Sequence, residues 1–278
     1  MNDHLWRKLA IVGLCASLLA LPLVSMAEQE VAAQGQKDSH ASAMLKDRLV
    51  ARFGRAVPQQ WGETVTGVKT RLDTDEKIIA LTMDACGSQK GMGFDAELLA
   101  FLEREQVPAT LFINARWIEP NRQAFDRLAA NPLFEIANHG LRHKPASVTG
   151  RSEYGIDGTQ NVAELVDEIE LGAAKIEAMT GRRPGFYRSG TAFYDEVAVQ
   201  VAEALGQQVV GFSVLGDKGA TYTRGEVKAA LMMATPGDII IVHMNHPEAG
   251  TCAGVIDAIP ELKRQGFRFV RLSERALR

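Results

Sequence analysis

Two histidines, His139 and His143, follow a short apolar run and are separated by three residues. Neutral imidazoles at this spacing can converge on one ion, whether the backbone between them is a turn or a helix. The pair alone is a weak signal, because two histidines at this spacing are more often unrelated surface residues. A metal site is therefore indicated only if groups of matching chemistry fall at related positions of the fold.

From Lys77 onward, short apolar runs of strand length alternate with amphipathic segments of helix length. The runs cover residues 78–83, 109–113, 134–137, 186–188, 208–214, 238–242 and 267–272. Residues 162–179 give the clearest helical stripe, which Gly181 closes at the position where helices often take a left-handed residue. This alternation predicts parallel pairing with right-handed crossovers, and hence a barrel or a doubly wound sheet.

Titratable side chains follow nearly every one of these predicted strands. They are Asp84, His139, His143, Arg188, Asp217, His243 and His246. In parallel barrels the reactive residues gather on the loops at the C-terminal ends of the strands. Their positions therefore predict a metal site or an acid–base site at one end of the sheet.

The N-terminus is typical of a secretory signal peptide, residues 1–27. Arg7 and Lys8 precede an apolar run over residues 9–24, and Ala27 ends a group of small residues that a signal peptidase reads. A membrane anchor is less favoured, because the run is shorter than the ~20 residues of a spanning helix and contains Pro22. We therefore expect an exported protein, periplasmic or secreted, with no membrane span in the mature chain.

The remaining chain divides into a short leading segment and one large domain. Residues 28–42 are polar and lack periodicity, which predicts a linker, and residues 43–53 predict a short helix. These belong to a leading segment over residues 28–60, and residues 61–278 form the expected α/β domain. The formal net charge of −3 gives no basic surface for nucleic acid. These features do not fix the oligomeric state.

The strand-end residues resemble the motifs of the NodB-homology polysaccharide deacetylases, also called carbohydrate esterase family four. The resemblance covers about residues 77–272 and follows the family's order of motifs. The matching stretches are Leu81-Thr-Met-Asp84, Asn138-His-Gly-Leu-Arg-His143, Tyr187-Arg-Ser-Gly190, more loosely Gly211-Phe-Ser-Val-Leu-Gly-Asp217, and Ile240-Ile-Val-His243.

The resemblance implies a deformed (β/α)7 barrel that removes acetyl groups from N-acetylated sugars of an envelope or extracellular polysaccharide. It also implies one divalent metal ion, usually zinc, bound by His139 and His143. By position in the motifs, Asp84 would be the general base and His243 the general acid. Arg188 would orient Asp84, and Asp217 would tune His243. Tyr187 and His246 are expected to contact the substrate.

The first motif departs from the family pattern. Family members usually carry two adjacent aspartates there, a base followed by a metal ligand, whereas this chain has Asp84-Ala85-Cys86-Gly87. We expect Asp84 itself to bind the ion, since Asp-His-His is a common hydrolytic zinc set. The alternatives are two histidines with waters, or no metal at all. An O-acetyl esterase and a non-catalytic sugar-binding barrel remain as alternative functions.

Two cysteines, Cys86 and Cys252, follow the first and sixth predicted strands. Loops after those strands face each other across the mouth of a small barrel, and export allows disulfides to form. We therefore expect a Cys86–Cys252 disulfide. The alternatives are a Cys86 thiolate bound to zinc in place of the missing carboxylate, and two free thiols.

Overall fold

The computed structural model describes residues 26–89 and 91–278. The predicted signal peptide lies outside these residues, except for its last two. The chain forms two units, Met1–Met44 and Leu45–Arg278, and the second contains every predicted site residue. No helix in the described part of the chain is both long and apolar enough to cross a lipid bilayer.

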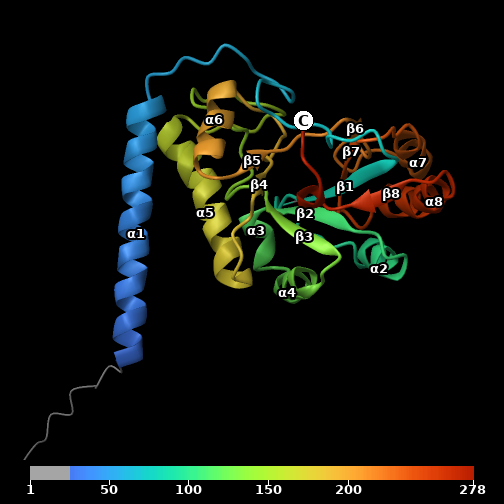
Figure 1. Ribbon diagram of the computed structural model, residues 1–278, viewed down its shortest axis with the longest axis horizontal. Coiled ribbons are helices and arrows are strands. Elements are labelled where there is room, and N and C mark those ends of the chain that lie inside the picture. Colours follow the sequence, from blue (N-terminus) through green and yellow to red (C-terminus); the bar gives the residue numbers. More distant parts are fainter. Residues whose placement is uncertain (1–25, 90) are drawn as a thin grey trace, which may run out of the picture. The chain divides into compact units, whose positions relative to one another are not determined.

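One helix, α1 (Met26–Phe53), occupies the leading segment (Figure 1). The linker predicted over residues 28–42 is therefore wrong as to conformation. Its Ala, Gln, Glu and Lys residues have high helix propensity, and it contains no proline and only one glycine, Gly35. The last turns of α1 belong to the second unit, where Leu49 and Phe53 are buried. A polar composition without periodicity therefore does not exclude a helix.

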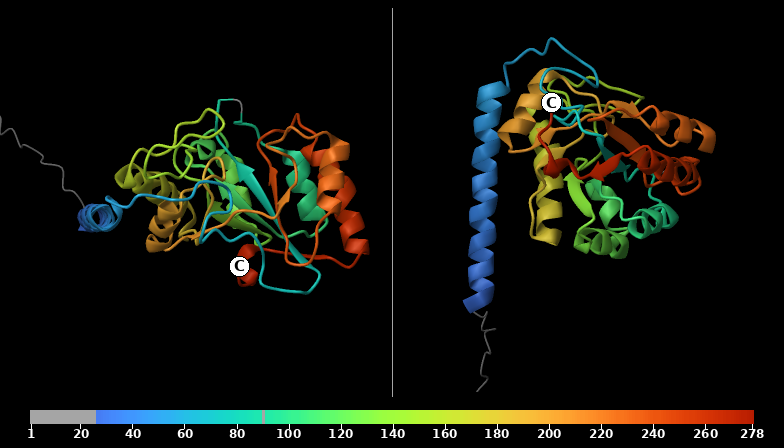
Figure 2. Two further views of the ribbon diagram at one scale, coloured as in Figure 1. Left: turned by 90° about the horizontal axis from the view of Figure 1, so that it is seen from above. Right: turned by 45° about the vertical axis from the view of Figure 1, so that its right-hand side comes forward.

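A curved parallel sheet forms the centre of the second unit (Figures 1 and 2). Its strands are β1 (Ile78–Ala85), β2 (Ala109–Ile113), β3 (Phe134–Asn138), β4 (Phe186–Tyr187), β5 (Gln208–Val209), β6 (Val214–Leu215), β7 (Ile239–His243) and β8 (Arg268–Val270). Their order is β5-β4-β3-β2-β1-β7-β6, and β8 pairs with β1 off this path. This is the deformed (β/α)7 barrel predicted from the sequence.

The fifth predicted strand divides into two short ones, β5 and β6. Between them the chain turns to the segment before β1, where the Gly211 amide donates to the Lys69 carbonyl at 2.8 Å. The Lys69 amide in turn donates to the Val209 carbonyl at 2.9 Å. These bonds make an isolated parallel bridge between Lys69 and Val210, and on either side of it the chain pairs with different neighbours, β5 with β4 and β6 with β7.

Helices join the strands and cover the outside of the sheet (Figure 2). They are α2 (Ala96–Arg104), α3 (Ala115–Ile118), α4 (Arg122–Ala130), α5 (Val162–Thr180), α6 (Glu196–Ala204), α7 (Arg224–Met232) and α8 (Thr251–Arg264), followed by a 3-10 turn at Leu272–Glu274. The helix α5 ends at Gly181, whose φ of 68° is left-handed as the sequence predicts.

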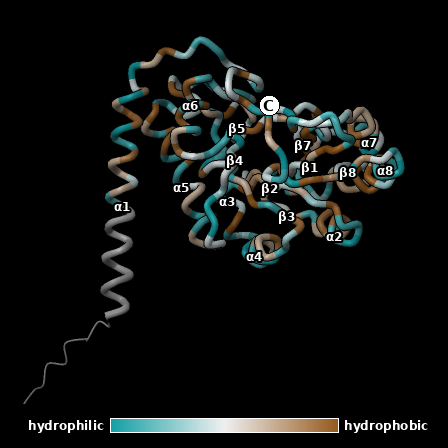
Figure 3. Tube along the Cα trace, viewed as in Figure 1, coloured by the Kyte–Doolittle hydropathy of each residue, from teal (hydrophilic) through white to brown (hydrophobic). Residues whose placement is uncertain are grey.

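The alternation of side chains along β1 positions the first functional residue. Every residue of β1 is buried, and the strand and its neighbour β7 are strongly hydrophobic (Figure 3). Ile79, Leu81 and Met83 join the large cluster under the outer helices, whereas Ile78 and Ala80 join a smaller one. Because side chains alternate between the faces of a strand, Asp84 shares the face of Ile78 and Ala80.

Candidate functional site

The predicted site residues meet at the C-terminal ends of four strands. Asp84 at the end of β1 is directly opposite His243 at the end of β7 in the parallel register. On the other side of β1, the strands β3 and β4 end together, and the Arg188 amide donates to the Asn138 carbonyl at 3.0 Å. His139 follows Asn138, so the sheet brings an aspartate, an arginine and two histidines to one edge.

Arg188 and Asp84 form a buried ion pair. Arg188 Nη1 donates to Asp84 Oδ1 at 2.7 Å and to Thr82 Oγ1 at 3.0 Å. The other guanidinium nitrogens donate to the carbonyls of Val210 and Gly211, so every nitrogen of the charged group is hydrogen-bonded. Removing either member of such a pair leaves an uncompensated buried charge. The Asp84 carboxylate is therefore held in one orientation.

The second carboxylate oxygen of Asp84, Oδ2, lies 3.6 Å from His139 Nε2. On its other side, His139 Nδ1 lies 2.9 Å from the Arg188 carbonyl oxygen. Because a carbonyl only accepts, Nδ1 carries the proton and Nε2 presents a lone pair to the site.

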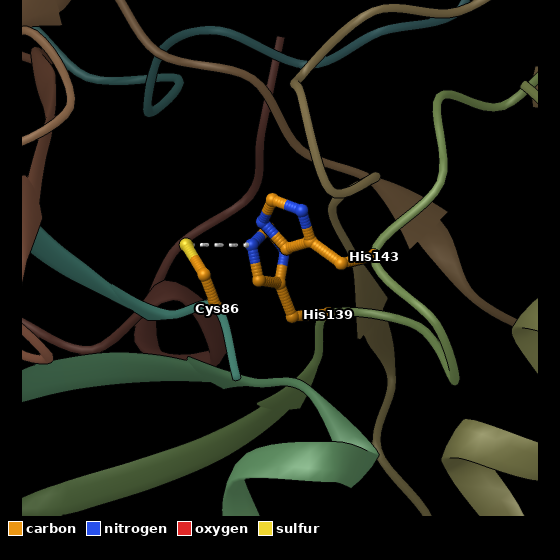
Figure 4. Close-up of side chains that lie close together, drawn as sticks. All are labelled: Cys86, His139 and His143. Carbon is orange, nitrogen blue, oxygen red and sulfur yellow. Dashed lines mark hydrogen bonds between the residues drawn. The ribbon is translucent and has the colours of Figure 1, made fainter. Parts of the chain in front are cut away.

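Three possible metal ligands converge beside this pair (Figure 4). Cys86, His139 and His143 each offer one ligand atom, and these atoms lie within 4.8 Å of one another. Cys86 Sγ is 3.8 Å from His139 Nε2, and the two imidazole rings meet edge to face with centroids 4.9 Å apart. Asp84 is not in this group. Asp84 Oδ2 lies near His139, but Cys86 is the residue whose ligand atom comes within this distance of both histidines.

The electrostatics of this cluster favour a thiolate. Burial raises the pKa of the Cys86 thiol, but the nearby His143, the hydrogen bond with His139 and the approach of His243 outweigh it. The pKa of Cys86 is thereby held well below its usual range. Burial lowers the pKa of His139, and the Asp84 carboxylate and Cys86 together raise it above its usual value.

The donor set also fits a metal ion. His143 Nε2 is buried and has no hydrogen-bond partner, which is costly for a polar atom unless something else pairs with it. Two imidazole nitrogens and a thiolate are ligands that zinc binds well, in sites that keep a fourth position open. Cys86, His139 and His143 therefore meet the chemical requirements of a catalytic zinc site.

A buried glutamate on α5 fixes the loop between the two histidines. Glu168 accepts hydrogen bonds from the backbone amide of Arg142 at 2.8 Å and from that of Lys144 at 3.2 Å. Between them, His143 has a φ of +63°, an uncommon conformation for a bulky residue. Gly190 packs against this turn so closely that a Cβ atom would lie 2.3 Å from the His143 carbonyl. Glu168 and Gly190 thus hold the strained backbone of His143 in place.

His243 and Asp217 form a second charged pair, and His243 lies beside Cys86. His243 Nδ1 lies 2.8 Å from Asp217 Oδ1, and Asp217 Oδ2 accepts from the His243 amide and from Thr251 Oγ1. Burial lowers the pKa of His243, but the Asp217 carboxylate raises it well above its usual value. Burial raises the pKa of Asp217, and His243 outweighs this and lowers it. The pair therefore favours an imidazolium next to a carboxylate.

The two predicted substrate contacts have different positions. Tyr187 is fully buried in the cluster that includes α5 and α6, so it cannot touch a substrate and that prediction is wrong. It is adjacent to Arg188 in the chain, and neighbouring strand residues point to opposite faces. His246 lies on the loop after β7, partly exposed, with Nδ1 2.9 Å from Glu248 Oε1. In this partly exposed position, His246 can still contact a substrate.

The predicted disulfide is absent, because Cys86 and Cys252 are both free thiols. Cys86 lies against the histidines, whereas Cys252 is buried at the start of α8 near Asp95. Burial and the negative charge of Asp95 raise the pKa of the Cys252 thiol to about 12. The two side chains thus lie in different surroundings and do not pair.

We expect residues 28–278 to show two reactive thiols in denaturant, with the same count before and after reduction. The measurement is a thiol titration of protein purified without reductant. No reactive thiol before reduction and two afterwards would show that Cys86 and Cys252 do form a disulfide.

Glu168 and Gly190 are missing from the residues predicted from the sequence. For Glu168 a signal exists, since it is a charged residue inside the apolar stripe of residues 162–179. A carboxylate on the buried face of a helix must have partners, which identifies it as a structural or functional group. Gly190 gives no such signal, because its role depends on the backbone of a distant turn.

Comparisons with known proteins point to one family. Residues 71–210 match the family model described as polysaccharide deacetylase. Over 214 residues the chain is 25% identical to a peptidoglycan-N-acetylglucosamine deacetylase of Bacillus cereus, covering 75% of this chain and 93% of that protein. It is 24% identical over 201 residues to a bifunctional xylanase/deacetylase of Pseudobutyrivibrio xylanivorans, covering 72% of this chain but only 30% of that longer protein.

Among solved structures, a carbohydrate esterase family 4 pseudoenzyme from Bacillus anthracis matches with a TM-score of 0.63 and 20% identity. The match covers 74% of this chain and 67% of that one. At this level of identity the likeness shows a shared fold.

Proposed function

The chain belongs to the polysaccharide deacetylase family, and from this membership we propose that it hydrolyses N-linked acetyl groups on the sugars of a polysaccharide, using one bound divalent ion, preferably zinc. The observation that carries this proposal is the arrangement of two preformed charged pairs around one group of metal-binding atoms. Asp84, paired with Arg188, lies beside His139 of this group, and His243, paired with Asp217, lies beside Cys86 of the same group.

We propose that Cys86, His139 and His143 hold the ion. Asp84 was the expected third ligand, but one of its oxygens is committed to Arg188 and it lies outside the group of converging atoms. The Cys86 thiolate supplies the negative charge that the missing carboxylate would have provided. When bound, such an ion polarises the acetyl carbonyl and makes a water molecule more acidic.

The protein's own groups then divide the proton transfers. Arg188 orients Asp84, whose second oxygen faces the site and accepts the proton of the attacking water. His243 keeps a proton because of Asp217, and its Nε2, the ring nitrogen that does not contact Asp217, donates a proton to the departing sugar nitrogen. An amine leaves poorly as an anion, so this donation matters most for an N-acetyl group.

The expected substrate is an acetylated envelope or extracellular polysaccharide, reached after export. The Bacillus cereus relative is a peptidoglycan-N-acetylglucosamine deacetylase, which supports N-acetylglucosamine as the sugar. Ala85, in place of the family's second aspartate, keeps one alternative open: a sugar-binding barrel without catalysis. The intact His243–Asp217 pair favours the enzyme, because sugar binding alone does not need a polarised imidazolium.

The test is acetate release from a hexamer of N-acetylglucosamine, compared with hydrolysis of 4-nitrophenyl acetate, before and after treatment with a chelator. Acetate release that stops with the chelator and returns with zinc supports the proposal. Ester hydrolysis without release from the hexamer would favour the O-acetyl esterase. Hexamer binding without any hydrolysis would favour the sugar-binding barrel.

Asp217→Asn should move the alkaline limb of the pH–rate profile to lower pH. Asp217 raises the pKa of His243, so its neutral replacement lowers that pKa, and the imidazolium needed for donation is lost at a lower pH. The measurement is kcat against pH for the wild type and the variant. An unmoved alkaline limb would show that His243 is not the proton donor.

A further inference from the structure

Tyr154 has an unusual position on the surface. It lies at the tip of a tight hairpin, where the backbones of Glu153 and Ile156 exchange two hydrogen bonds of 3.1 and 2.9 Å. The two central residues, Tyr154 and Gly155, have φ values of +52° and +74°. Turns with positive φ at both central positions prefer asparagine followed by glycine, and a bulky residue is strained there. The turn itself therefore does not explain the tyrosine.

Burial does not explain it either, since Tyr154 is 69% exposed. Of the aromatic side chains in residues 40–89 and 91–278, it is the only one in the exposed class. An exposed aromatic residue with a strained backbone is a reason to look for a function in binding.

Tyr154 is one of three aromatic residues that lie together, which we call the aromatic platform: Trp61, Tyr154 and Phe193. The rings of Tyr154 and Phe193 meet edge to face with centroids 5.6 Å apart, and those of Trp61 and Phe193 are 5.9 Å apart. Polar groups border the platform. The Arg151 guanidinium lies 5.1 Å from the centre of the Trp61 ring, and Glu153 Oε2 lies 3.4 Å from Trp61 Nε1.

The platform belongs to the same loops as the catalytic site. Tyr154 lies on the loop between β3 and α5, which begins with His139 and His143. Phe193 lies on the loop between β4 and α6, which begins with Arg188. Both loops therefore leave the sheet at its C-terminal edge, where substrates of such barrels bind.

Backbone contacts tie these loops together next to the metal-binding group. The Phe193 carbonyl accepts from the Ala146 amide at 3.1 Å, and Gly190 packs directly against His143. Trp61 is held next to these loops through its neighbour Gly62. The Gly62 amide donates to the Tyr194 carbonyl at 3.1 Å, and the Gly62 carbonyl accepts from the Tyr194 amide at 3.0 Å. Ala146 is three residues from His143, a span of at most about 10 Å of extended chain, so the platform borders the site.

We propose that the aromatic platform is a sugar-binding subsite, which holds a ring of an N-acetylated glycan next to the ring whose acetyl group is removed. This inference rests on the function proposed above. A pyranose ring has an apolar face of C–H groups that packs on an aromatic ring, and its hydroxyl and acetamido groups need polar partners at the edge. Arg151 supplies donors and Glu153 supplies acceptors at that edge.

Tryptophan fluorescence gives a direct test of binding. Residues 28–278 contain two tryptophans, Trp61 and Trp117, and Trp117 is fully buried. The hexamer of N-acetylglucosamine is mixed with the metal-loaded protein, and the fluorescence is read within seconds, before products accumulate. We expect a saturable change that Trp61→Phe abolishes.

Tyr154→Asn is the decisive variant, because asparagine suits the turn and should leave the melting temperature equal or higher. We expect it to weaken hexamer binding about tenfold, as the loss of a central aromatic contact commonly does. Tyr154→Phe should keep the wild-type affinity. Met233→Asn, at an exposed site after α7, is the matched control and should also bind normally.

Unchanged affinity in Tyr154→Asn would overturn the subsite. So would a wild type that hydrolyses 4-nitrophenyl acetate but does not respond to the hexamer, while leaving a metal-dependent hydrolase intact. Binding that depends on Tyr154, with no acetate released by the zinc-loaded protein, would support the subsite and contradict the proposed deacetylase function.

Discussion

Asp84→Asn should lower kcat for acetyl release by about 10²–10⁴-fold, because an amide cannot accept the proton of the attacking water. It should also lower the melting temperature. Arg188 is fully buried, and breaking a buried ion pair by neutralising one partner costs about 3–5 kcal/mol. The measurements are steady-state kinetics and a thermal melt of the same preparations, with metal content as a third reading.

The matched control is Thr82→Val, which removes another acceptor of the same Arg188 nitrogen but leaves the carboxylate in place. It should lower stability by about 2 kcal/mol, because Thr82 Oγ1 also donates to the Ile240 carbonyl and two hydrogen bonds are lost, and it should retain most of the activity. Because Asp84 is not assigned as a metal ligand, the metal content of Asp84→Asn should stay near the wild-type value. Activity within tenfold of the wild type would rule out Asp84 as the base.

His243→Ala should affect amides far more than activated esters. Loss of a positioned general acid costs about 10²–10⁴-fold when the leaving group needs a proton, as a sugar amine does. The phenolate of 4-nitrophenyl acetate leaves without that help, so its hydrolysis should fall much less. The measurement is kcat for both substrates in the wild type and the variant.

An equal loss on the two substrates would contradict the role of His243 as proton donor to the leaving group. Since His243 also lies beside Cys86, the metal content of the variant must be compared with that of the wild type. A normal metal content with a substrate-dependent loss assigns the effect to proton donation.

The location of the site could be predicted from the sequence because parallel strands carry their C-terminal ends to the same edge. Asp84, His139, Arg188 and His243 each follow or end an apolar run of strand length. Once those runs are paired in parallel, the four side chains must be near neighbours, whatever the detailed register. The predictions of the fold and of the two charged pairs, Asp84 with Arg188 and His243 with Asp217, rest on this regular alternation.

The choice between Asp84 and Cys86 as the third metal ligand could not be made from the sequence, which offered Cys86 only as an alternative. Asp84 and Cys86 are two residues apart, so they would share a face if β1 continued. The strand instead ends at Ala85, and Cys86 leaves the regular pleat and turns to the histidines. Where a strand ends depends on its neighbours, and the local sequence Asp84-Ala85-Cys86 does not contain that information.

Two other predictions, the substrate contact of Tyr187 and the Cys86–Cys252 disulfide, are wrong for different reasons. The buried position of Tyr187 follows from strand alternation once Arg188 is placed inside the barrel, so it could have been predicted. The Cys86–Cys252 disulfide could not be judged from sequence, because bonding requires Cα atoms within about 7 Å and suitable directions. Those quantities belong to the tertiary structure alone.

The most direct test of the proposed metal site is the zinc content of the mature protein after dialysis against chelator-free buffer, for the wild type, His139→Ala, Cys86→Ser and Cys252→Ser. We expect about one zinc per chain in the wild type and in Cys252→Ser, since that cysteine lies outside the metal-binding group. His139→Ala should lose the metal, and Cys86→Ser should bind it at least about 100-fold more weakly, because it lacks the thiolate ligand. Full zinc binding in Cys86→Ser, or no zinc in the wild type even after zinc is added, would contradict the proposed site.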